Sequence, residues 1–335
     1  MSGTAFNFPD LEGSNVLLVG GMGFVGSNLA HRMVRMGAKV TIVDAMLEPY
    51  GGNLYNLKGI EKQTAFIRGD ARDGDLMKQA VMDKDFIFTL FAQVSHLLSM
   101  TDPMLDIDIN CRGNMTVLEA VRKYNDSAKV LYGGTRGSTG DAKYLPVDEN
   151  HPDEPPDING IDKWAAEKYH LIYHRVHGME TTSLRIGNTY GERHQMKHGH
   201  YGVLNYFIRR AMMGEPIQIY GDGEQTRDYT YVDDLVDAFL LMMGSKEVWG
   251  RMYLIGGGQM VSFKTMVDMV VEAVGEGKVE HVPFPDSQRK AIDVSKFFVT
   301  TERLRSATGW TPKTPLSEGM KKTVAFYREH LKEYI

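Results

Sequence analysis

A glycine-rich segment near the N-terminus has the composition of a phosphate-binding turn. Residues 19–26 read VGGMGFVG, directly after an apolar run and directly before a segment of helical spacing. Glycines permit a tight turn and let backbone N–H groups approach a pyrophosphate. The N-terminus of the following helix stabilises the negative charge of that pyrophosphate. The spacing is G-x-x-G-x-x-G rather than the commoner G-x-G-x-x-G, so a tight turn without a ligand is the alternative interpretation. The candidate ligand-binding residues here are Gly20, Gly23, Phe24, Val25 and Gly26.

An acidic residue at the end of the next apolar run favours a dinucleotide as the ligand. Asp44 closes the run Lys39–Asp44 (KVTIVD), 18 residues beyond Gly26. A carboxylate at this place accepts hydrogen bonds from ribose hydroxyls and repels a 2′-phosphate. The sequence therefore predicts NAD as the cofactor, in preference to NADP.

The elements that must position these residues alternate in type along the first half of the chain. Strands are predicted at 15–19, 39–44, 64–68, 85–90, 129–132 and 182–186, and helices at 27–36, 104–124 and 162–177. Strands that alternate with helices indicate βαβ units and a parallel sheet. Nearly continuous Val, Ile and Leu suit a sheet that is covered on both faces. Residues 141–157, rich in Pro, Asp and Glu, are predicted to form a loop.

The C-terminal third has shorter, mixed elements, expected at 216–220, 230–243, 252–255 and 262–274. We therefore predict an α/β fold: a doubly wound, Rossmann-like parallel sheet with a smaller, interleaved α/β lobe. The predicted NAD-binding domain is residues 1–185, to which segments near 228–256 return. Residues 186–227 and 257–335 are assigned to the second lobe.

Composition excludes several classes of function. The 335-residue chain has 38 Lys and Arg against 43 Asp and Glu, a net charge of −5, so nucleic acid and anionic membranes are not expected as general partners. The single cysteine, Cys111, excludes an internal disulfide framework and a cysteine-based metal cluster. No apolar run approaches the roughly 18 residues of a membrane span, and the first residues lack the pattern of a signal peptide. We expect a cytoplasmic protein without a membrane partner.

Further motifs are spread over almost the whole chain. They are residues 68–73 (RGDARD), 90–93 (LFAQ), 102–103 (DP), Asn110, Lys163 with Glu167, 184–191 (LRIGNTYG), 220–223 (YGDG), 226–229 (TRDY), 232–234 (VDD) and 309–312 (GWTP). Together with the glycine segment they resemble the extended short-chain dehydrogenase/reductase family, which includes nucleotide-sugar epimerases and dehydratases. The resemblance implies NAD-dependent modification of a nucleoside diphosphate-sugar, foremost an epimerisation through a transient keto-sugar, as in UDP-glucose 4-epimerase-like enzymes.

The resemblance also implies roles for residues at both ends of the ligand site. Asp70 and Ala71 would flank the adenine, Phe91, Ala92 and Gln93 would line the cofactor, and Asn110 would support the site. In the second lobe, which the family uses for the sugar nucleotide, Asn188, Arg227 and Arg289 would meet the diphosphate. Gln218 and Tyr220 would lie beside the base. His194, His198 and His200 are interpreted as a solvated or substrate-facing loop rather than a zinc site, and no metal is expected.

The catalytic positions show a departure from the family. Its members end one strand with Ser or Thr and place Tyr-x-x-x-Lys at a helix start. The tyrosine exchanges a proton with a sugar hydroxyl, and the lysine binds the nicotinamide ribose and lowers the tyrosine pKa. Thr135 and Lys163 occupy two of these positions, and Lys163 is counted with the cofactor contacts as well. Asn159 stands where the family has tyrosine.

Three interpretations of Asn159 stay open, because an amide does not titrate and cannot act as a general acid or base. His96, which follows a strand directed at the cofactor, has a reference pKa of about 6.5 that suits proton transfer. Alternatively, a water molecule held by Thr135 and Asn159 relays the proton. In the third interpretation the chain is a weak catalyst or a non-catalytic nucleotide-sugar-binding relative.

Arg136 and Gly137 mark a second departure. The family's 4,6-dehydratases carry Asp-Glu directly after the Thr, and its decarboxylases usually carry Glu there. The residues found here count against a dehydratase or a decarboxylase, which are kept as alternatives. Arg136 is expected to contact an acidic or unusual sugar or to face solvent.

A homodimer is the expected assembly. The helices 104–124 and 162–177 have the position of the family's intersubunit four-helix bundle. Six apolar residues are assigned to a face that a monomer would leave exposed: Val117, Leu118, Val121, Trp164, Leu171 and Ile172.

Overall fold

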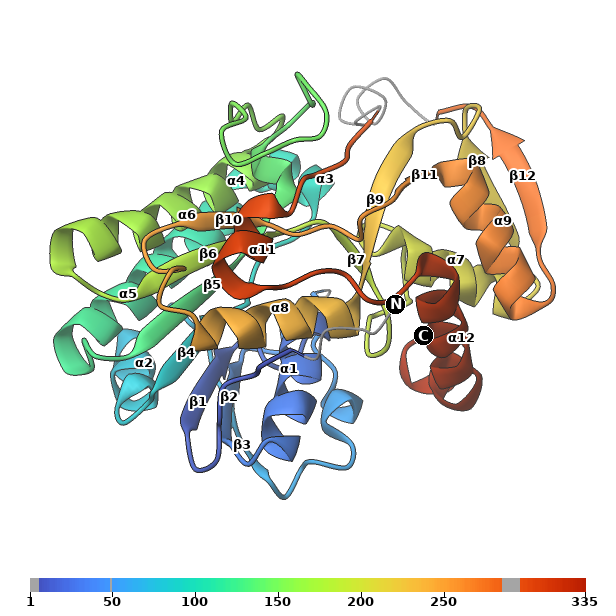
Figure 1. Ribbon diagram of the computed structural model, residues 1–335. Coiled ribbons are helices and arrows are strands. Elements are labelled where there is room, and N and C mark those ends of the chain that lie inside the picture. Colours follow the sequence, from blue (N-terminus) through green and yellow to red (C-terminus); the bar gives the residue numbers. More distant parts are fainter. Residues whose placement is uncertain (1–5, 49, 285–295) are drawn as a thin grey trace.

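A seven-stranded parallel sheet forms the centre of the computed structural model, which describes residues 6–48, 50–284 and 296–335 (Figure 1). The strand order is β10-β6-β5-β4-β1-β2-β3. The bounds are β1 (Asn15–Val19), β2 (Lys39–Asp44), β3 (Thr64–Arg68), β4 (Phe86–Thr89), β5 (Lys129–Thr135), β6 (Thr181–Ile186) and β10 (Met252–Leu254). The order reverses direction between β1 and β4, and ligands of open α/β sheets bind at such a switch point. The predicted doubly wound fold is confirmed.

Helices cover both faces of this sheet because its strands are apolar on both sides. In β1, Val16 and Leu18 belong to one core and Leu17 and Val19 to the other. The first core includes α1 (Phe24–Arg35) and α8 (Val232–Gly244), which contact each other. The opposite core includes α2 (Gly74–Val81), α5 (Gly113–Tyr124) and α6 (Ile158–His177). Figure 1 shows the two helical layers on either side of the strands.

The segment predicted as one helix over 104–124 is interrupted. It consists of α4 (Pro103–Asp106), a π-helical turn η2 (Ile107–Arg112) and α5. The wider turn lies where two polar side chains, Asp106 and Asn110, are buried. A π turn inside a helix is frequent at functional sites. Further short helices are η1 (Leu54–Leu57), α3 (His96–Thr101), η3 (Arg136–Ser138) and η4 (Leu331–Glu333).

In the described residues, the second lobe contains two small sheets and three helices, on the right in Figure 1. One sheet joins β7 (Asn188–Tyr190), β9 (Thr226–Tyr231) and β11 (Met260–Ser262), and the other pairs β8 (Pro216–Tyr220) with β12 (Lys278–Val282). The helices are α7 (Val203–Met212), α9 (Phe263–Val274) and α12 (Leu316–His330). In contrast to the predicted division, α11 (Glu302–Thr308) contacts α8 and β10. Leu304 and Trp310 are buried in the first core, so this stretch of 257–335 belongs with the large sheet.

The expected apolar dimer face is partly wrong. Val117, Leu118 and Val121 are fully buried in the core between α5, α2 and the sheet, and they are therefore not exposed in a monomer. The three residues of α6 are half-buried: Trp164, Leu171 and Ile172.

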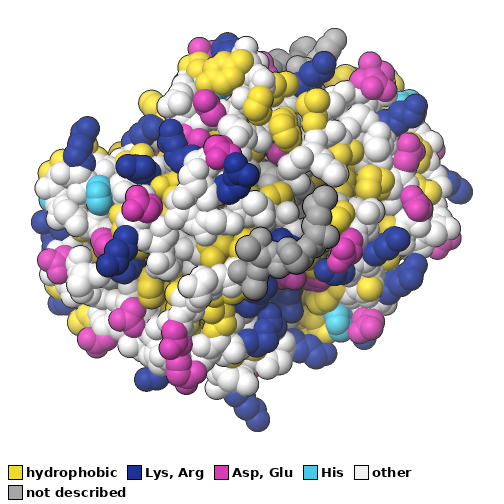
Figure 2. Space-filling model, viewed as in Figure 1, with side chains coloured by type: hydrophobic (Ala, Val, Ile, Leu, Met, Phe, Trp, Pro, Cys, Tyr) yellow, Lys and Arg dark blue, Asp and Glu magenta, His cyan; other side chains and the backbone are white. Residues whose placement is uncertain are grey.

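The distribution of surface charge and the apolar character of the helices both bear on whether nucleic acids or membranes could be partners. Positive and negative side chains are interspersed over the face shown in Figure 2. Across the described part of the chain, no helix combines the length and the apolar character that a membrane crossing requires.

Candidate functional site

A cavity of about 230 Å³ lies where the glycine segment joins β1 to α1. Gly20 has a φ of +85°, and a Cβ at this position would stand against the backbone of Leu90 and Phe91. A Cβ on Gly26 would stand 2.6 Å from the Cα of Gly21. Both glycines therefore allow backbone to approach backbone, which brings the turn against the end of β4 and opens the cavity between them.

This cavity fits a dinucleotide. Gly23 is the N-cap of α1 and offers no side chain to its first N–H groups, which suits a phosphate in that place. The Asp44 carboxylate accepts hydrogen bonds from the backbone N–H groups of Met22 at 3.0 Å and Met46 at 2.8 Å. Burial nevertheless raises the pKa of Asp44. Ten of the predicted cofactor residues line the cavity: Gly20, Gly23, Phe24, Val25, Gly26, Asp44, Asp70, Ala71, Phe91 and Ala92.

Gln93 departs from its expected place because its side chain turns into the interior. It is fully buried, lines neither cavity of the site, and donates from Nε2 to Oδ2 of Asp106 at 2.6 Å. Asn110 donates to the other oxygen of Asp106 at 2.8 Å and accepts from the backbone N–H of Gln93 at 3.1 Å. These two amides hold a buried carboxylate behind the cofactor cavity, and Asp106 was missed because its sequence surroundings resemble an ordinary helix turn.

Asn159 joins the same buried network. Its amide nitrogen donates to the backbone oxygen of Gln93 at 2.7 Å and to Oδ2 of Asp106 at 3.1 Å, and the residue is 2% exposed. Asn159 therefore borders the larger cavity described below but directs its donors away from it. The amide of Asn159 therefore has a structural role in this network, and it cannot act as an acid or a base.

Two titratable groups beside Asn159 have unusual pKa values. Burial lowers the pKa of Lys163 to about 8, although the nearby Asp106 carboxylate acts in the opposite direction. Burial, together with a hydrogen bond to Asp106, raises the pKa of Asp162 to about 7. Close carboxylates cannot both ionise freely in a buried site. Lys163 is still mainly cationic at neutral pH and supplies positive charge to the wall of the larger cavity described below.

A second cavity of about 740 Å³ lies between the carboxyl ends of β5 and β6 and the second lobe. Predicted residues from both parts of the chain line it together: Thr135, Asn159, Lys163, Asn188, Gln218, Tyr220 and Arg227. The amide nitrogen of Asn188 is buried without a hydrogen-bond partner among the described residues. Arg227 is 7% exposed and donates to the backbone oxygen of Thr226. Arg289 lies outside the described residues.

The two cavities adjoin each other. They share seven lining residues: Phe24, Val25, Leu90, Ala92, Val94, His194 and Tyr201. Tyr50 and Tyr201, which line the first cavity, were missed because loop tyrosines carry no sequence signal of their own. Across the ranges that the structure describes, no three His, Cys, Asp or Glu side chains are grouped to hold a metal.

His96 faces the larger cavity beside an acidic partner. Its Nδ1 lies 2.6 Å from Oδ2 of Asp157, whose other oxygen caps α6 by accepting from the N–H of Gly160 at 2.8 Å. Asp157 was missed as a site residue, although an aspartate directly before a helix is a recognisable N-cap signal. Thr135 accepts from the N–H of Gly137 at 3.1 Å. Arg136 also lines the cavity, and its guanidinium lies 5.0 Å from the ring centre of Phe297.

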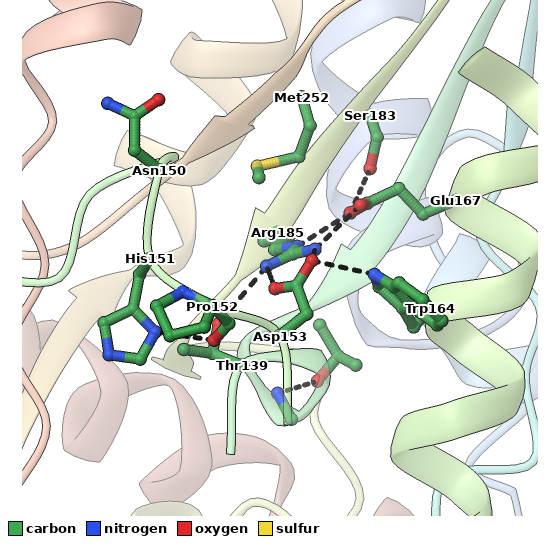
Figure 3. Close-up of polar contacts among 12 residues, drawn as sticks. Thr139, Asn150, His151, Pro152, Asp153, Trp164, Glu167, Ser183, Arg185 and Met252 are labelled. Atoms are coloured by element: carbon green, nitrogen blue, oxygen red, sulfur yellow. Dashed lines mark hydrogen bonds and ion pairs between the residues drawn. The ribbon is translucent and has the colours of Figure 1, made fainter. Parts of the chain in front are cut away.

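A buried ion cluster fixes the loop that supplies Asp157 (Figure 3). Arg185 on β6 is 2% exposed and contacts Asp153 with two nitrogens, at 2.5 and 2.9 Å. The same guanidinium donates to Glu167 on α6 at 2.8 Å, and Trp164 donates to Asp153 at 2.8 Å. Bidentate contacts to a buried guanidinium are strong and directional. The 141–157 loop is thus tied to the sheet and to α6 only four residues before Asp157.

Comparison with known proteins agrees with this geometry. The family model described as the NAD dependent epimerase/dehydratase family matches residues 16–256. A putative UDP-glucose 4-epimerase of Methanocaldococcus jannaschii is 32% identical over 94% of this chain and 99% of its own length. A UDP-glucose 4-epimerase of Thermotoga maritima, solved with UDP-glucose, is 31% identical with a TM-score of 0.85, covering 95% and 99% of the two chains.

A third relative was solved with the cofactor. The UDP-glucose 4-epimerase of Thermus thermophilus, in complex with NAD, is 29% identical with a TM-score of 0.83, covering 94% of this chain and 99% of its own. The chain therefore belongs to the NAD dependent epimerase/dehydratase family.

Proposed function

We propose that the chain is an NAD-dependent epimerase of nucleoside diphosphate-sugars that works through a transient keto-sugar. The observation that carries this proposal is the wall that the two cavities share, with Lys163 and Thr135 lining the larger of the two. When bound, NAD takes a hydride from a sugar carbon and returns it. The cavity walls hold the sugar nucleotide against the cofactor, which converts an encounter of two molecules into a reaction within one complex.

The larger cavity supplies binding groups for a diphosphate. Asn188 presents a buried amide nitrogen that lacks a partner within the described chain, and a phosphate oxygen would satisfy it. Arg227 adds a guanidinium whose planar donors suit phosphate oxygens. Gln218 and Tyr220 line the outer part of the same cavity, where the nucleotide base is proposed to lie.

The cofactor preference rests on Asp44. Its buried carboxylate belongs to the cavity wall and would repel a 2′-phosphate. Titration calorimetry should therefore give tighter binding of NAD than of NADP. Equal affinities would contradict this assignment.

A non-catalytic sugar-nucleotide-binding protein is the second candidate, and the buried hydrogen bonds of Asn159 favour it. Arg136 in place of an acid still argues against elimination of water or carbon dioxide. The test is incubation of the NAD-loaded protein with UDP-glucose, UDP-N-acetylglucosamine and dTDP-glucose. An isomeric product of unchanged mass supports the epimerase, a loss of 18 or 44 mass units identifies a dehydratase or a decarboxylase, and binding without a product leaves the second candidate.

A second copy of the chain is the proposed partner of the α3–α6 surface. This surface carries five exposed apolar side chains: Leu97, Met100, Met104, Ile107 and Ile161. They lie near one another because α3, α4 and η2 all contact α6. Exposed patches of this kind mark interaction sites. A cytoplasmic location stays a prediction, with which the single unpaired Cys111 agrees.

A further inference from the structure

We infer that His96 is the general acid and base of the reaction and that Asp157 is its positioning residue. This inference rests on the proposed function and names the group that exchanges the proton. His96 is the first residue of α3, and Asp157 is the N-cap of α6. The inference assigns the proton transfer to this pair, because the amide of Asn159 has no atom that can exchange a proton.

The hydrogen bonds of Asp157 determine which nitrogen of His96 is free. Burial acts to raise the pKa of Asp157, but the hydrogen bond and charge of His96 and the hydrogen bond from the Gly160 N–H together outweigh burial, and the pKa lies below its ordinary value. Asp157 is therefore a carboxylate at neutral pH and only accepts hydrogen bonds. The hydrogen of the neutral imidazole must then lie on Nδ1, 2.6 Å from Oδ2 of Asp157. Nε2 is left with a lone pair, as a base requires.

The imidazole is near the predicted catalytic Thr135. The side chain of His96 is 42% exposed and lines the larger cavity, whereas the side chain of Asp157 is 2% exposed. A Cβ built on Gly137 would stand 3.5 Å from Cε1 of His96 and 3.4 Å from Oγ1 of Thr135. The ring and the hydroxyl therefore border the same part of the cavity. A sugar hydroxyl placed there is within reach of both groups.

The proton balance is complete with the groups at hand. The O–H bond of the sugar hydroxyl breaks and its proton passes to Nε2 of His96, while the C–H bond of the same carbon breaks and its hydride passes to NAD. The carbonyl bond forms from the electron pair left on oxygen. The return step reverses each transfer on the other face of the carbonyl, with His96 as the acid. Thr135 donates a hydrogen bond to the oxygen, and no further oxidant or reductant is needed.

The other titratable groups nearby are less suited. Lys163 is mainly cationic at neutral pH, and Asp106 is fully buried behind the amides of Gln93 and Asn159. Asp162 has one carboxylate oxygen buried without a partner among the described atoms and lines neither cavity. His96 combines exposure to the cavity with a charged, buried partner.

The kinetic test compares His96→Gln with the matched control His177→Gln, a change at an exposed histidine near the far end of α6. Reduction of bound NAD by each of the three sugar nucleotides is followed by nicotinamide absorbance. His96→Gln should lower the rate about 10²–10⁴-fold with unchanged affinity for NAD and UDP, and His177→Gln should keep the wild-type rate. Added imidazole should restore part of the activity of His96→Ala. A wild-type rate in His96→Gln overturns the inference.

Asp157 is tested by a spectroscopic signature. Asn is as good an N-cap as Asp, so Asp157→Asn should preserve the start of α6. Nitrogen NMR of the wild-type protein should show His96 protonated on Nδ1, and Asp157→Asn should move the hydrogen to Nε2 and lower the rate. An Nε2–H tautomer in the wild type refutes the dyad. If the wild type reacts with none of the three sugar nucleotides, the proposed function fails as well, whereas full activity of His96→Gln in an active enzyme refutes the dyad alone.

Discussion

Asn159→Tyr introduces the side chain that the sequence comparison predicts for the family at this position, and it should reduce both stability and activity. The substitution removes the hydrogen bonds from Asn159 to the backbone oxygen of Gln93 and to Asp106. Neither acceptor is orphaned, since Asn110 still donates to Gln93 at 3.1 Å and Gln93 to Asp106 at 2.6 Å. The lost bonds should cost about 1.5–3 kcal/mol, the range for hydrogen bonds to charged groups. The larger ring should cost a further 1–3 kcal/mol or so through overpacking.

The assay for this variant separates the two contributions. Urea unfolding of Asn159→Ala measures the lost hydrogen bonds without the added volume, and Asn159→Tyr measures both. Turnover of the sugar nucleotide should fall in Asn159→Tyr, because His96 already transfers the proton and the ring crowds the sugar. A rate of hydride transfer that is tenfold or more higher in Asn159→Tyr would refute this reasoning. It would show that the wild-type chain lacks a general base and that no other group has replaced it. Unchanged stability and turnover would show that Asn159 is misplaced in the catalytic slot.

Three further outcomes are expected. Arg227→Ala should weaken UDP binding about tenfold to a hundredfold, the loss of a charge-assisted contact, and leave NAD binding unchanged by calorimetry; an unchanged UDP affinity would remove Arg227 from the site. Asp162→Asn should raise the free energy of unfolding by an amount that grows from pH 4 to pH 7 in urea titrations. The reason is that the folded pKa of Asp162, about 7, lies above the unfolded value of 3.8, so ionisation of this carboxyl opposes folding. A gain in stability that does not depend on pH would contradict this prediction. Light scattering should give a dimeric mass that Met104→Lys lowers, and a monomeric wild type at micromolar concentration would exclude the dimer.

The first strands of the large sheet were predictable because each contains a short run of mainly apolar residues. Asn15–Val19, Lys39–Asp44 and Thr64–Arg68 have the predicted bounds. The start of α6 was placed four residues late, at 162 instead of 158, because Asn159 and Gly160 are poor helix formers and mask the capped helix start after Asp157. Local sequence identifies such elements but fixes their ends poorly.

The buried polar layer was not predictable from sequence. Asp106 and Asn110 are buried beside the π turn, and their partners Gln93 and Asn159 lie 13 to 53 residues away from Asp106 in the chain. The burial of Val117 likewise depends on which helix packs against α5. Helical spacing in the sequence does not specify that neighbour. Residue types identified most of the cavity lining, whereas the orientation of each side chain came from contacts distant in sequence.

The Arg185 cluster also constrains how the cavity can diversify. Because Arg185 is the buried cation between Asp153 and Glu167, its loss would leave two buried carboxylates without the guanidinium that pairs with both. The loop that carries Asp157 therefore tolerates few changes of length or register. Gln218 and Tyr220 border the same cavity from β8, a strand of the separate two-stranded sheet that is free of this constraint. Evolution toward another sugar nucleotide should accordingly proceed by exchanges on the β8 side, while the catalytic side stays invariant.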